Sequence, residues 1–351
     1  MAKIENVDKN FKVGTSIAQQ GVKFYNPLKA PFVISGVEYI DGVYYRMNPD
    51  VAERVSDGVK YLNTNTAGGR IRFKTDSGYV AICAKYVTVG KMPHFAFSGS
   101  IGFDLYVDNV YSGTFMPSVD IANTLEAIVY IGNNGLREII VDFPLYSAVS
   151  DVSVGVDENA TILPPTPYIN DKPIVYYGSS ITQGGCASRA GNSYQAIISR
   201  EFNVDYINLG FSGNAKAEDE MIDYIKGLDM SLFVYDYDHN APSTEHLSAT
   251  HEKMFLAIRK AHPDIPVVMM TRPKKVRTEE EEKRIEIVRH TYQNAKNRGE
   301  RVYMLDGDDL TALCGQDGTV DNCHPNDYGF YSMAKALIDL FNKEGFIKFI
   351  K

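Results

Sequence analysis

The residue pattern changes near the middle of this chain of 351 residues. Up to about Val156, short apolar or aromatic runs are broken by turn residues, as in Phe32–Tyr39 and Gly78–Ile82. Short runs with frequent turns are typical of an antiparallel β-sandwich. From about Lys172 onward, strand-like apolar runs alternate with longer helical runs. That alternation predicts right-handed βαβ units around a parallel sheet, so we expect two different architectures in one chain.

The boundary between the two patterns is rich in proline. Prolines at positions 164, 165 and 167 mark a stiff connector. We place an N-terminal β-sandwich domain over residues 1–160 and an α/β domain over residues 161–351. The length exceeds that of a typical single domain and leaves room for two hydrophobic cores.

The α/β domain has five candidate strands, each a short apolar run. They are Ile174–Tyr177, Tyr206–Leu209, Leu232–Asp236, Pro266–Met270 and Val302–Leu305. Longer helical segments such as Glu245–Lys260 and Thr278–Lys296 lie between them. Ligands of parallel sheets bind beyond the carboxyl ends of the strands, so polar residues that follow these strands are candidates for a functional site.

Two short motifs in the α/β domain carry groups suited to nucleophilic catalysis. Ser180 follows an apolar run and stands in a Gly-rich loop, where a strand would present a nucleophile. Asp321 precedes His324 by three residues, and Pro325 follows. A serine hydroxyl is a weak nucleophile until an imidazole takes its proton, and an acid behind the imidazole fixes its tautomer. Ser180, His324 and Asp321 therefore suggest a hydrolase triad.

Two further segments supply hydrogen-bond donors after neighbouring strands. Gly213 lies in the stretch Asn208–Asn214, and a glycine there lets a backbone N–H approach a bound oxyanion closely. Asn240 follows the run Leu232–Asp236, and its side-chain amide could donate to the same oxyanion. We expect Gly213, Asn240 and the N–H of Ser180 to form an oxyanion hole.

Serine, glycine, asparagine and histidine in this order resemble the four blocks of the SGNH (GDSL-like) hydrolase superfamily. The segment Ser98–Tyr106 looks like the signature of the GxDLY domain, which precedes one branch of these hydrolases. The strings Tyr177–Arg189 and His324–Ala334 also resemble that branch. Ser179 departs from the family's Gly-Asp-Ser, and the third block reads Asp-His-Asn-Ala instead of Gly-x-Asn-Asp. The resemblance implies a flavodoxin-like α/β/α domain behind a jelly-roll-like β-sandwich.

The same resemblance implies a serine esterase. Its expected substrate is a small-molecule or oligosaccharide ester, with acetyl groups on mannan or xylan fragments as the leading candidates, and no cofactor is expected. A short-chain lipase or thioesterase-like acylhydrolase would use the same constellation of residues. A carbohydrate-binding protein with an inactive hydrolase scaffold is an alternative from another class. The sequence leaves the oligomeric state open.

Phe103, Asp104 and Tyr106 of the GxDLY segment have two interpretations. They could form a buried strand with a structural carboxylate. Alternatively, the segment closes one wall of the active site, where an aromatic ring stacks on a sugar and Asp104 accepts from a hydroxyl. On the second interpretation, these three residues are the candidate substrate-binding residues.

Charge and hydropathy exclude other partners. A net charge of −8 and the lack of a sustained Lys/Arg stripe argue against nucleic acid. The segment Met1–Lys9 lacks the features of a signal peptide, and no apolar run approaches the ~18 residues of a membrane span. We therefore expect a cytoplasmic protein without membrane contact, although a secreted chain without its leader would look the same.

The four cysteines show no Cys-x-x-Cys spacing. We therefore expect no metal site and reduced thiols. Cys186 lies shortly after Ser180, and Cys323 directly precedes His324. If the fold is correct, both thiols border one pocket.

Overall fold

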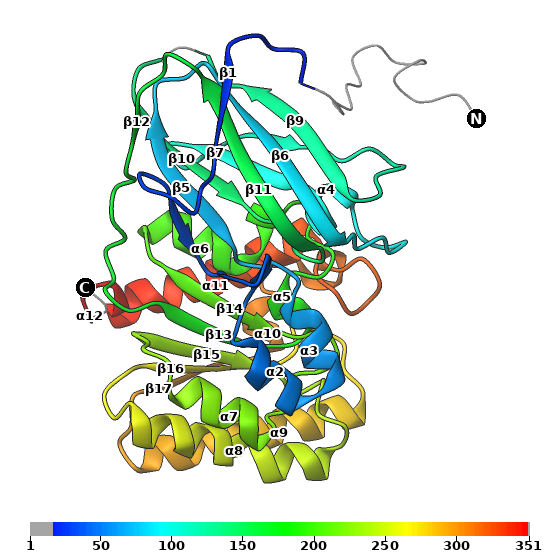
Figure 1. Ribbon diagram of the computed structural model, residues 1–351. Helices are drawn as coiled ribbons and strands as arrows, with labels where there is room; N and C mark the ends of the chain where they lie inside the picture. The colour runs from blue at the N-terminus through cyan, green and yellow to red at the C-terminus, as the bar shows by residue number, and fades with distance from the viewer. Residues whose placement is uncertain (1–16, 133, 350–351) are drawn as a thin grey trace.

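The computed structural model describes residues 17–132 and 134–349. Figure 1 shows two layered bodies, with the N-terminal β-sandwich stacked on an α/β body. One sheet of the sandwich has the strand order β1-β11-β6-β9, and the other has the order β12-β5-β10-β7-β8, with β2 also pairing with β5. Every pairing in these two sheets is antiparallel.

The strands of the sandwich have the following bounds. The first sheet consists of β1 (Val22–Tyr25), β6 (Tyr79–Thr88), β9 (Thr124–Tyr130) and β11 (Ala148–Asp157). The second consists of β2 (Val33–Ser35), β5 (Arg70–Thr75), β7 (Phe103–Val107), β8 (Val110–Phe115), β10 (Arg137–Asp142) and β12 (Ile162–Leu163). A small hairpin of β3 (Glu38–Ile40) and β4 (Val43–Tyr45) is separate from both.

The sandwich forms because apolar side chains of both sheets meet in one core. Phe73, Leu105 and Val141 of the second sheet are fully buried there with Ile82 and Val154 of the first. Burial of this kind is worth roughly 1.5–3 kcal/mol for each large side chain. The predicted β-sandwich is confirmed, and the jelly-roll character of its connections stays a prediction.

The α/β body contains a five-stranded parallel sheet of order β14-β13-β15-β16-β17. Its strands are β13 (Ile174–Gly178), β14 (Tyr206–Gly210), β15 (Leu232–Asp236), β16 (Val267–Met270) and β17 (Val302–Leu305). Each expected strand is present, and its ends differ from the expected ones by at most one residue. The order is that of flavodoxin-like folds, which confirms the predicted fold class.

Helices cover both faces of the parallel sheet (Figure 1). One face packs against α7 (Asp219–Lys226), α8 (Thr244–Ala261) and α9 (Glu279–Asn297). The other packs against α6 (Tyr194–Phe202), α11 (Asp327–Glu344) and α12 (Phe346–Phe349). The α/β body also has the shorter helical turns α5 (Ser180–Gln183), η1 (Ala190–Asn192), α10 (Gly307–Leu310) and η2 (Gly315–Gly318), and a further turn, α4 (Phe97–Ser100), lies between β6 and β7 of the sandwich.

A segment from the N-terminal half packs into the α/β body. Helices α2 (Pro49–Val55) and α3 (Asp57–Asn63) bury Ala52, Val59 and Leu62 in the same core as β15 and α7. At the C-terminal end of the sandwich sequence, strand β12 lies beyond residue 160 and pairs with β5 of the sandwich. The two bodies therefore share a wide contact, and the packing does not follow a single boundary in the sequence.

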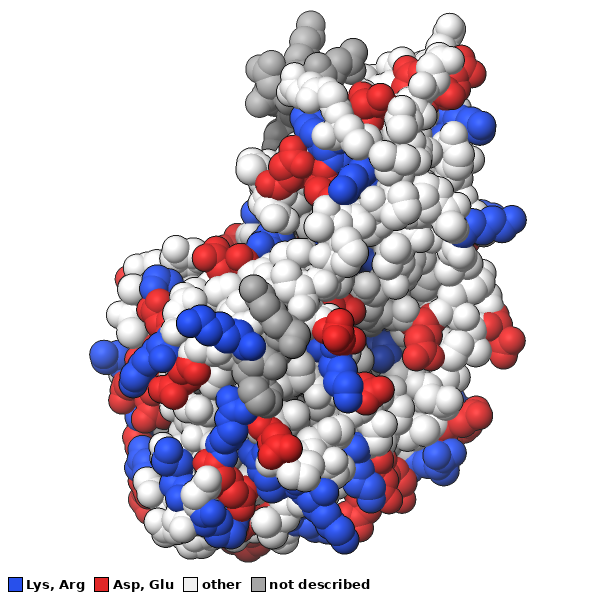
Figure 2. Space-filling model, turned by 90° about the vertical axis from the view of Figure 1, so that its left-hand side faces the viewer, with Lys and Arg blue, Asp and Glu red and all other residues white. Residues whose placement is uncertain are grey.

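The exterior of the described residues is mixed in charge. On the face shown in Figure 2, basic and acidic side chains are interspersed over the lower, α/β part of the molecule. Among the described helices, none has the length and apolar character needed to span a bilayer.

Candidate active site

Ser180, His324 and Asp321 form one hydrogen-bonded chain beyond the carboxyl end of the parallel sheet. Ser180 Oγ lies 2.9 Å from Nε2 of His324. On the other side of the ring, Nδ1 lies 2.8 Å from Oδ2 of Asp321. The carboxylate therefore fixes the proton on Nδ1, which leaves Nε2 free to accept the proton of the serine hydroxyl. The structure brings together all three residues of the predicted triad.

The local sequence explains why Ser180 stands where it does. Strand β13 ends at Gly178, and Ser180 is the first residue of the short helix α5. The side chain of Ser179 caps this helix by accepting from the N–H of Ile181 at 3.1 Å. Any side chain at position 178 would clash, because a Cβ atom would lie 1.6 Å from a carboxylate oxygen of Asp236. The close contact between β13 and β15 thus fixes the start of α5.

The tight loop before α11 presents His324. Oδ1 of Asp321 accepts from the N–H of Cys323 at 3.1 Å and from the N–H of His324 at 2.7 Å. Asn322 closes the turn with a positive φ of 62°, which asparagine tolerates better than most residues. Partial burial opposes the charged form of Asp321, but these bonds and the imidazole outweigh it and hold the pKa of the carboxyl below its usual range.

The imidazole of His324 lies in an unusual electrostatic setting. Contact with the side chain of Cys323 raises the pKa of His324 to about 9. Asp321 also raises this pKa, whereas burial lowers it. Burial alone would raise the pKa of the Cys323 thiol, but His324 and Arg272 together hold it below its usual value. The two side chains therefore stabilise each other in their charged forms.

The two predicted oxyanion residues lie in the same cavity as Ser180. Gly213 and Asn240 line it together with Ser180 and His324. Gly213 has a φ of 66°, in the left-handed region that glycine adopts without strain. Among the described residues, the N–H groups of Ser180 and Gly213 donate to no partner. Asn240 holds its side chain in place by donating one amide hydrogen to the carbonyl of Phe211 at 3.2 Å.

The cavity has a volume of about 650 Å³, which suits a small ligand. Both bodies of the molecule contribute to its wall. The N-terminal half supplies the loop after β6, over residues 89–95, together with Tyr61 and Tyr146. The ring centroids of His94 and Phe95 lie 5.7 and 6.3 Å from that of His324. Sequence reasoning missed this loop, because nothing in its residues distinguishes it from other turns of the sandwich.

Residues of the N-terminal half also brace the catalytic loops. The hydroxyl of Tyr146 donates to the carbonyl of Ser180 at 3.2 Å and lies 2.7 Å from Oγ of Ser212. Arg46 is buried and donates to the carbonyls of Asn208 and Gly210 at the end of β14. The loop that carries Gly213 is thus held from the sandwich side.

The structure does not bring Phe103, Asp104 and Tyr106 to the cavity, which corrects their assignment as substrate-binding residues. All three lie on the buried strand β7, and none lines the cavity. Asp104 accepts from the N–H of Gly191 at 2.9 Å, and the hydroxyl of Tyr106 accepts from Arg189 at 3.2 Å. These contacts fasten the GxDLY strand to the α/β body, and all residues of β7 are buried.

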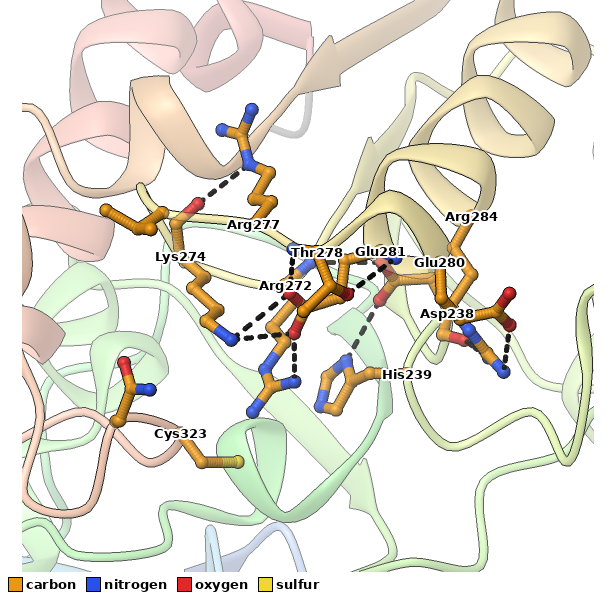
Figure 3. Close-up of polar contacts among 12 residues, drawn as sticks. Asp238, His239, Arg272, Lys274, Arg277, Thr278, Glu280, Glu281, Arg284 and Cys323 are labelled. Atoms are coloured by element: carbon orange, nitrogen blue, oxygen red, sulfur yellow. Dashed lines mark hydrogen bonds and ion pairs between the residues drawn. The ribbon is translucent and has the colours of Figure 1, made fainter.

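Figure 3 shows the polar and charged residues that lie near Cys323. Arg272 lies beside Cys323 and forms an ion pair of 2.7 Å with Glu281 of α9, which also pairs with Lys274 at 2.8 Å. Nδ1 of His239 lies 2.9 Å from the carboxylate of Asp238. Helix α9 thereby braces the segment after β16, where Arg272 and Lys274 lie.

Both cysteines predicted to border the pocket lie close to His324. Sγ of Cys186 and Sγ of Cys323 each lie within 4.8 Å of a ring nitrogen of that residue. Cys323 lines the cavity, whereas Cys186 is buried outside its lining. Both are free thiols.

Comparisons with known proteins agree with this geometry. The GDSL-like lipase/acylhydrolase family matches residues 171–342, and the GxDLY family, described as the N-terminus of SGNH-type esterases, matches residues 22–162. No curated protein sequence matches significantly.

Three solved structures illustrate the similarity. A putative GDSL-like lipase from Bacteroides ovatus is 27% identical, with a TM-score of 0.81 over 94% of this chain and 99% of its own. The salicylyl-acyltransferase SsfX3 of a tetracycline biosynthetic pathway is 19% identical, with a TM-score of 0.76 over 93% and 98%. An acetyl xylan esterase from the rumen bacterium Butyrivibrio proteoclasticus is 11% identical, with a TM-score of 0.59 over 92% and 100%. The chain belongs to the GDSL-like lipase/acylhydrolase family, in the SGNH-type branch with an N-terminal GxDLY domain, and is a carboxylic ester hydrolase.

Proposed function

We propose that the protein is a serine esterase that removes acetyl or other short acyl groups from hydroxyls of carbohydrate. The observation that carries the proposal is the continuous chain from Ser180 through His324 to Asp321, which opens into a cavity walled by both bodies. The carbohydrate part rests on fold similarity to esterases such as the acetyl xylan esterase named above.

The geometry supports a two-step acyl transfer. Ser180 Oγ attacks the carbonyl carbon of the ester while Nε2 of His324 takes its proton. The oxyanion accepts hydrogen bonds from the N–H groups of Ser180 and Gly213 and from the amide of Asn240. His324 then gives the proton to the leaving sugar hydroxyl, and an acyl-serine remains. A water molecule, deprotonated by His324, releases the acid and restores the serine.

The substrate is tested by measuring acid release from a matched panel. It contains acetylated xylan and mannan oligosaccharides, 4-nitrophenyl acetate, a long-chain 4-nitrophenyl ester and acetyl coenzyme A. The proposal predicts the highest kcat/KM on an acetylated oligosaccharide, and the loss of this activity in Ser180→Ala. Preference for the long-chain ester or the thioester would assign the protein to the acylhydrolase alternative. Binding of oligosaccharide without any Ser180-dependent turnover would support the non-catalytic alternative.

Replacing Asn240 with alanine tests the oxyanion hole. Loss of one preorganised donor typically lowers kcat by ~10²–10³. We expect a fall of that size in kcat with little change in KM, because the donor acts on the charge that develops in the transition state. Steady-state kinetics on 4-nitrophenyl acetate measures both constants. Asn214→Ala, which removes a nearby amide outside the cavity lining, is the matched control, and equal falls in both variants would contradict the assignment.

The charged pair of Cys323 and His324 predicts a distinctive pH profile. His324 accepts the serine proton only when its imidazole is neutral, so kcat/KM of the native chain rises with pH through its pKa of about 9. In Cys323→Ala the largest cause of the raised pKa is gone, so the inflection moves down toward the ordinary value of 6.5. Profiles between about pH 5 and 10, with Cys314→Ala as the control, check this shift. The same inflection in all three proteins would refute the coupling.

A further inference from the structure

Three side chains that bind zinc well converge beside Ser180. Ligand atoms of His94, Cys186 and His324 all lie within 4.8 Å of one another. His94 lies in the loop after β6, Cys186 in the loop after α5, and His324 in the loop before α11. We propose that these three residues form a zinc site whose occupation switches the esterase off.

The ligand set and its spacing suit this metal. Two imidazoles and one thiolate form a His₂Cys set, and zinc is commonly bound by such nitrogen and sulfur ligands. From typical bond lengths, a tetrahedral zinc ion holds its ligand atoms about 3.4–3.6 Å apart. Since the ligand atoms lie within 4.8 Å of one another, the side chains must close by at most about 1.4 Å. His94 can provide much of this movement, because it is exposed and makes no hydrogen bond to another described residue. A water molecule would take the fourth position.

The orientation of His324 also fits metal binding. Its Nδ1 is held by the carboxylate of Asp321 at 2.8 Å, so Nε2 is the nitrogen left for a ligand. Histidines that bind metals usually donate their other ring N–H to a carboxylate, which orients the ring and raises its basicity. The loop before Cys186 packs on the Nε2 side of the ring, since a Cβ atom at Gly185 would lie 3.2 Å from Cδ2 of His324.

The backbone at Cys186 provides a second, independent observation. Its φ is 71°, in the left-handed region that residues with a side chain rarely adopt. Glycine would adopt this conformation without strain, and two glycines directly precede it in the same loop. Strained positions of this kind gather at functional sites, where the surrounding fold holds them in place. The strained backbone at Cys186 therefore holds its thiol within 4.8 Å of a ring nitrogen of His324.

Occupation of the site would stop catalysis for a simple reason. Zinc bound to Nε2 of His324 uses the electron pair that must accept the proton of Ser180. When they bind the ion, the thiol of Cys186 and the imidazolium of His324, where it is protonated, release their protons to solvent, so the step is reversible by a chelator and involves no oxidation. The inhibition rests on the proposed role of His324 as general base, whereas the binding does not.

The test combines activity with a direct readout of metal binding. Zinc chloride should inhibit hydrolysis of 4-nitrophenyl acetate by the native chain, and a chelator should restore it. In Cys186→Ala and in His94→Ala, the half-inhibitory concentration of zinc should rise at least about 100-fold. Loss of a residue that only hydrogen-bonds to a metal ligand lowers metal affinity by about 10–100-fold, and loss of the ligand itself should lower it further. Each variant is compared with itself without zinc. Cys314→Ala, which removes a buried thiol elsewhere, should respond like the native chain.

Cobalt(II) reports binding without catalysis. Adding it to the native chain should produce a thiolate-to-cobalt absorption band in the near ultraviolet, which Ser180→Ala retains and Cys186→Ala loses. Circular dichroism of each variant checks the fold. A native chain with neither inhibition nor the band would overturn the proposal. Loss of the zinc response in Cys323→Ala but not in Cys186→Ala would also overturn it, because the ion would then sit on the alternative cluster of Asp321, Cys323 and His324.

Discussion

Replacing Ser180 with alanine should lower kcat by roughly 10⁴- to 10⁶-fold, with KM little changed. The variant keeps the cavity and the oxyanion donors but lacks the hydroxyl that lies 2.9 Å from Nε2 of His324. No acyl-serine can form, so the remaining rate comes from substrate binding and oxyanion stabilisation alone. Steady-state kinetics on 4-nitrophenyl acetate, with the uncatalysed rate subtracted, measures the change.

The cavity offers a matched control for this variant. Ser212 also lines the cavity, but its hydroxyl contacts Tyr146 instead of the imidazole. Ser212→Ala should therefore keep activity within about tenfold of the native value, as expected for loss of a supporting hydrogen bond. A large loss of activity in Ser212→Ala together with an active Ser180→Ala would show that Ser180 is not the nucleophile.

Replacing Asp321 with asparagine should lower kcat by about 10⁴-fold. Asparagine has nearly the same shape, so the turn before α11 can persist through one remaining side-chain oxygen. It cannot hold the proton on Nδ1 of His324, and it cannot stabilise the imidazolium that forms when Ser180 loses its proton. The imidazole is then in the wrong tautomer for much of the time.

The effect of Asp321→Asn is measured as kcat on 4-nitrophenyl acetate, in parallel with a control variant in the same loop. Asp317 lies earlier in this loop, in the turn η2, and Asp317→Asn should leave kcat near the native value. Thermal unfolding of both variants verifies that they are folded. Near-native turnover in Asp321→Asn would show that the carboxylate does not orient His324.

The fold could be predicted in large part, because its signals are local. Each strand of the parallel sheet is a short apolar run followed by polar residues, and that pattern is visible without any knowledge of contacts. The same local pattern predicts that Ser180, Gly213 and Asn240 lie at one edge of the sheet. All three residues line one cavity in the structure.

Contacts between distant segments could not be predicted from the sequence. The helices α2 and α3 belong to the core of the α/β body, although they stand within the sandwich sequence. The loop over residues 89–95 reaches His324 across more than two hundred residues, and no periodicity or motif marks it. Asp104 was open to two interpretations for the same reason, since only the packing of β7 against Gly191 decides between them.

The proposed zinc site illustrates the same limit. The spacing of the cysteines argued against any metal, because sequence motifs detect ligands that are close in the chain. His94, Cys186 and His324 come from three separate loops, and only the stacking of the two bodies brings their ligand atoms within 4.8 Å of one another.

The central claim is that Ser180 becomes acylated during turnover, and covalent labelling tests it most directly. The protein is treated with phenylmethylsulfonyl fluoride, which reacts with activated serines, and the adduct is located by peptide mass mapping. We predict one adduct per chain, on the peptide that contains Ser180, formed in step with the loss of esterase activity and absent from Ser180→Ala and His324→Ala. Loss of activity with the adduct on another residue, or full activity after stoichiometric labelling of Ser180, would contradict the account.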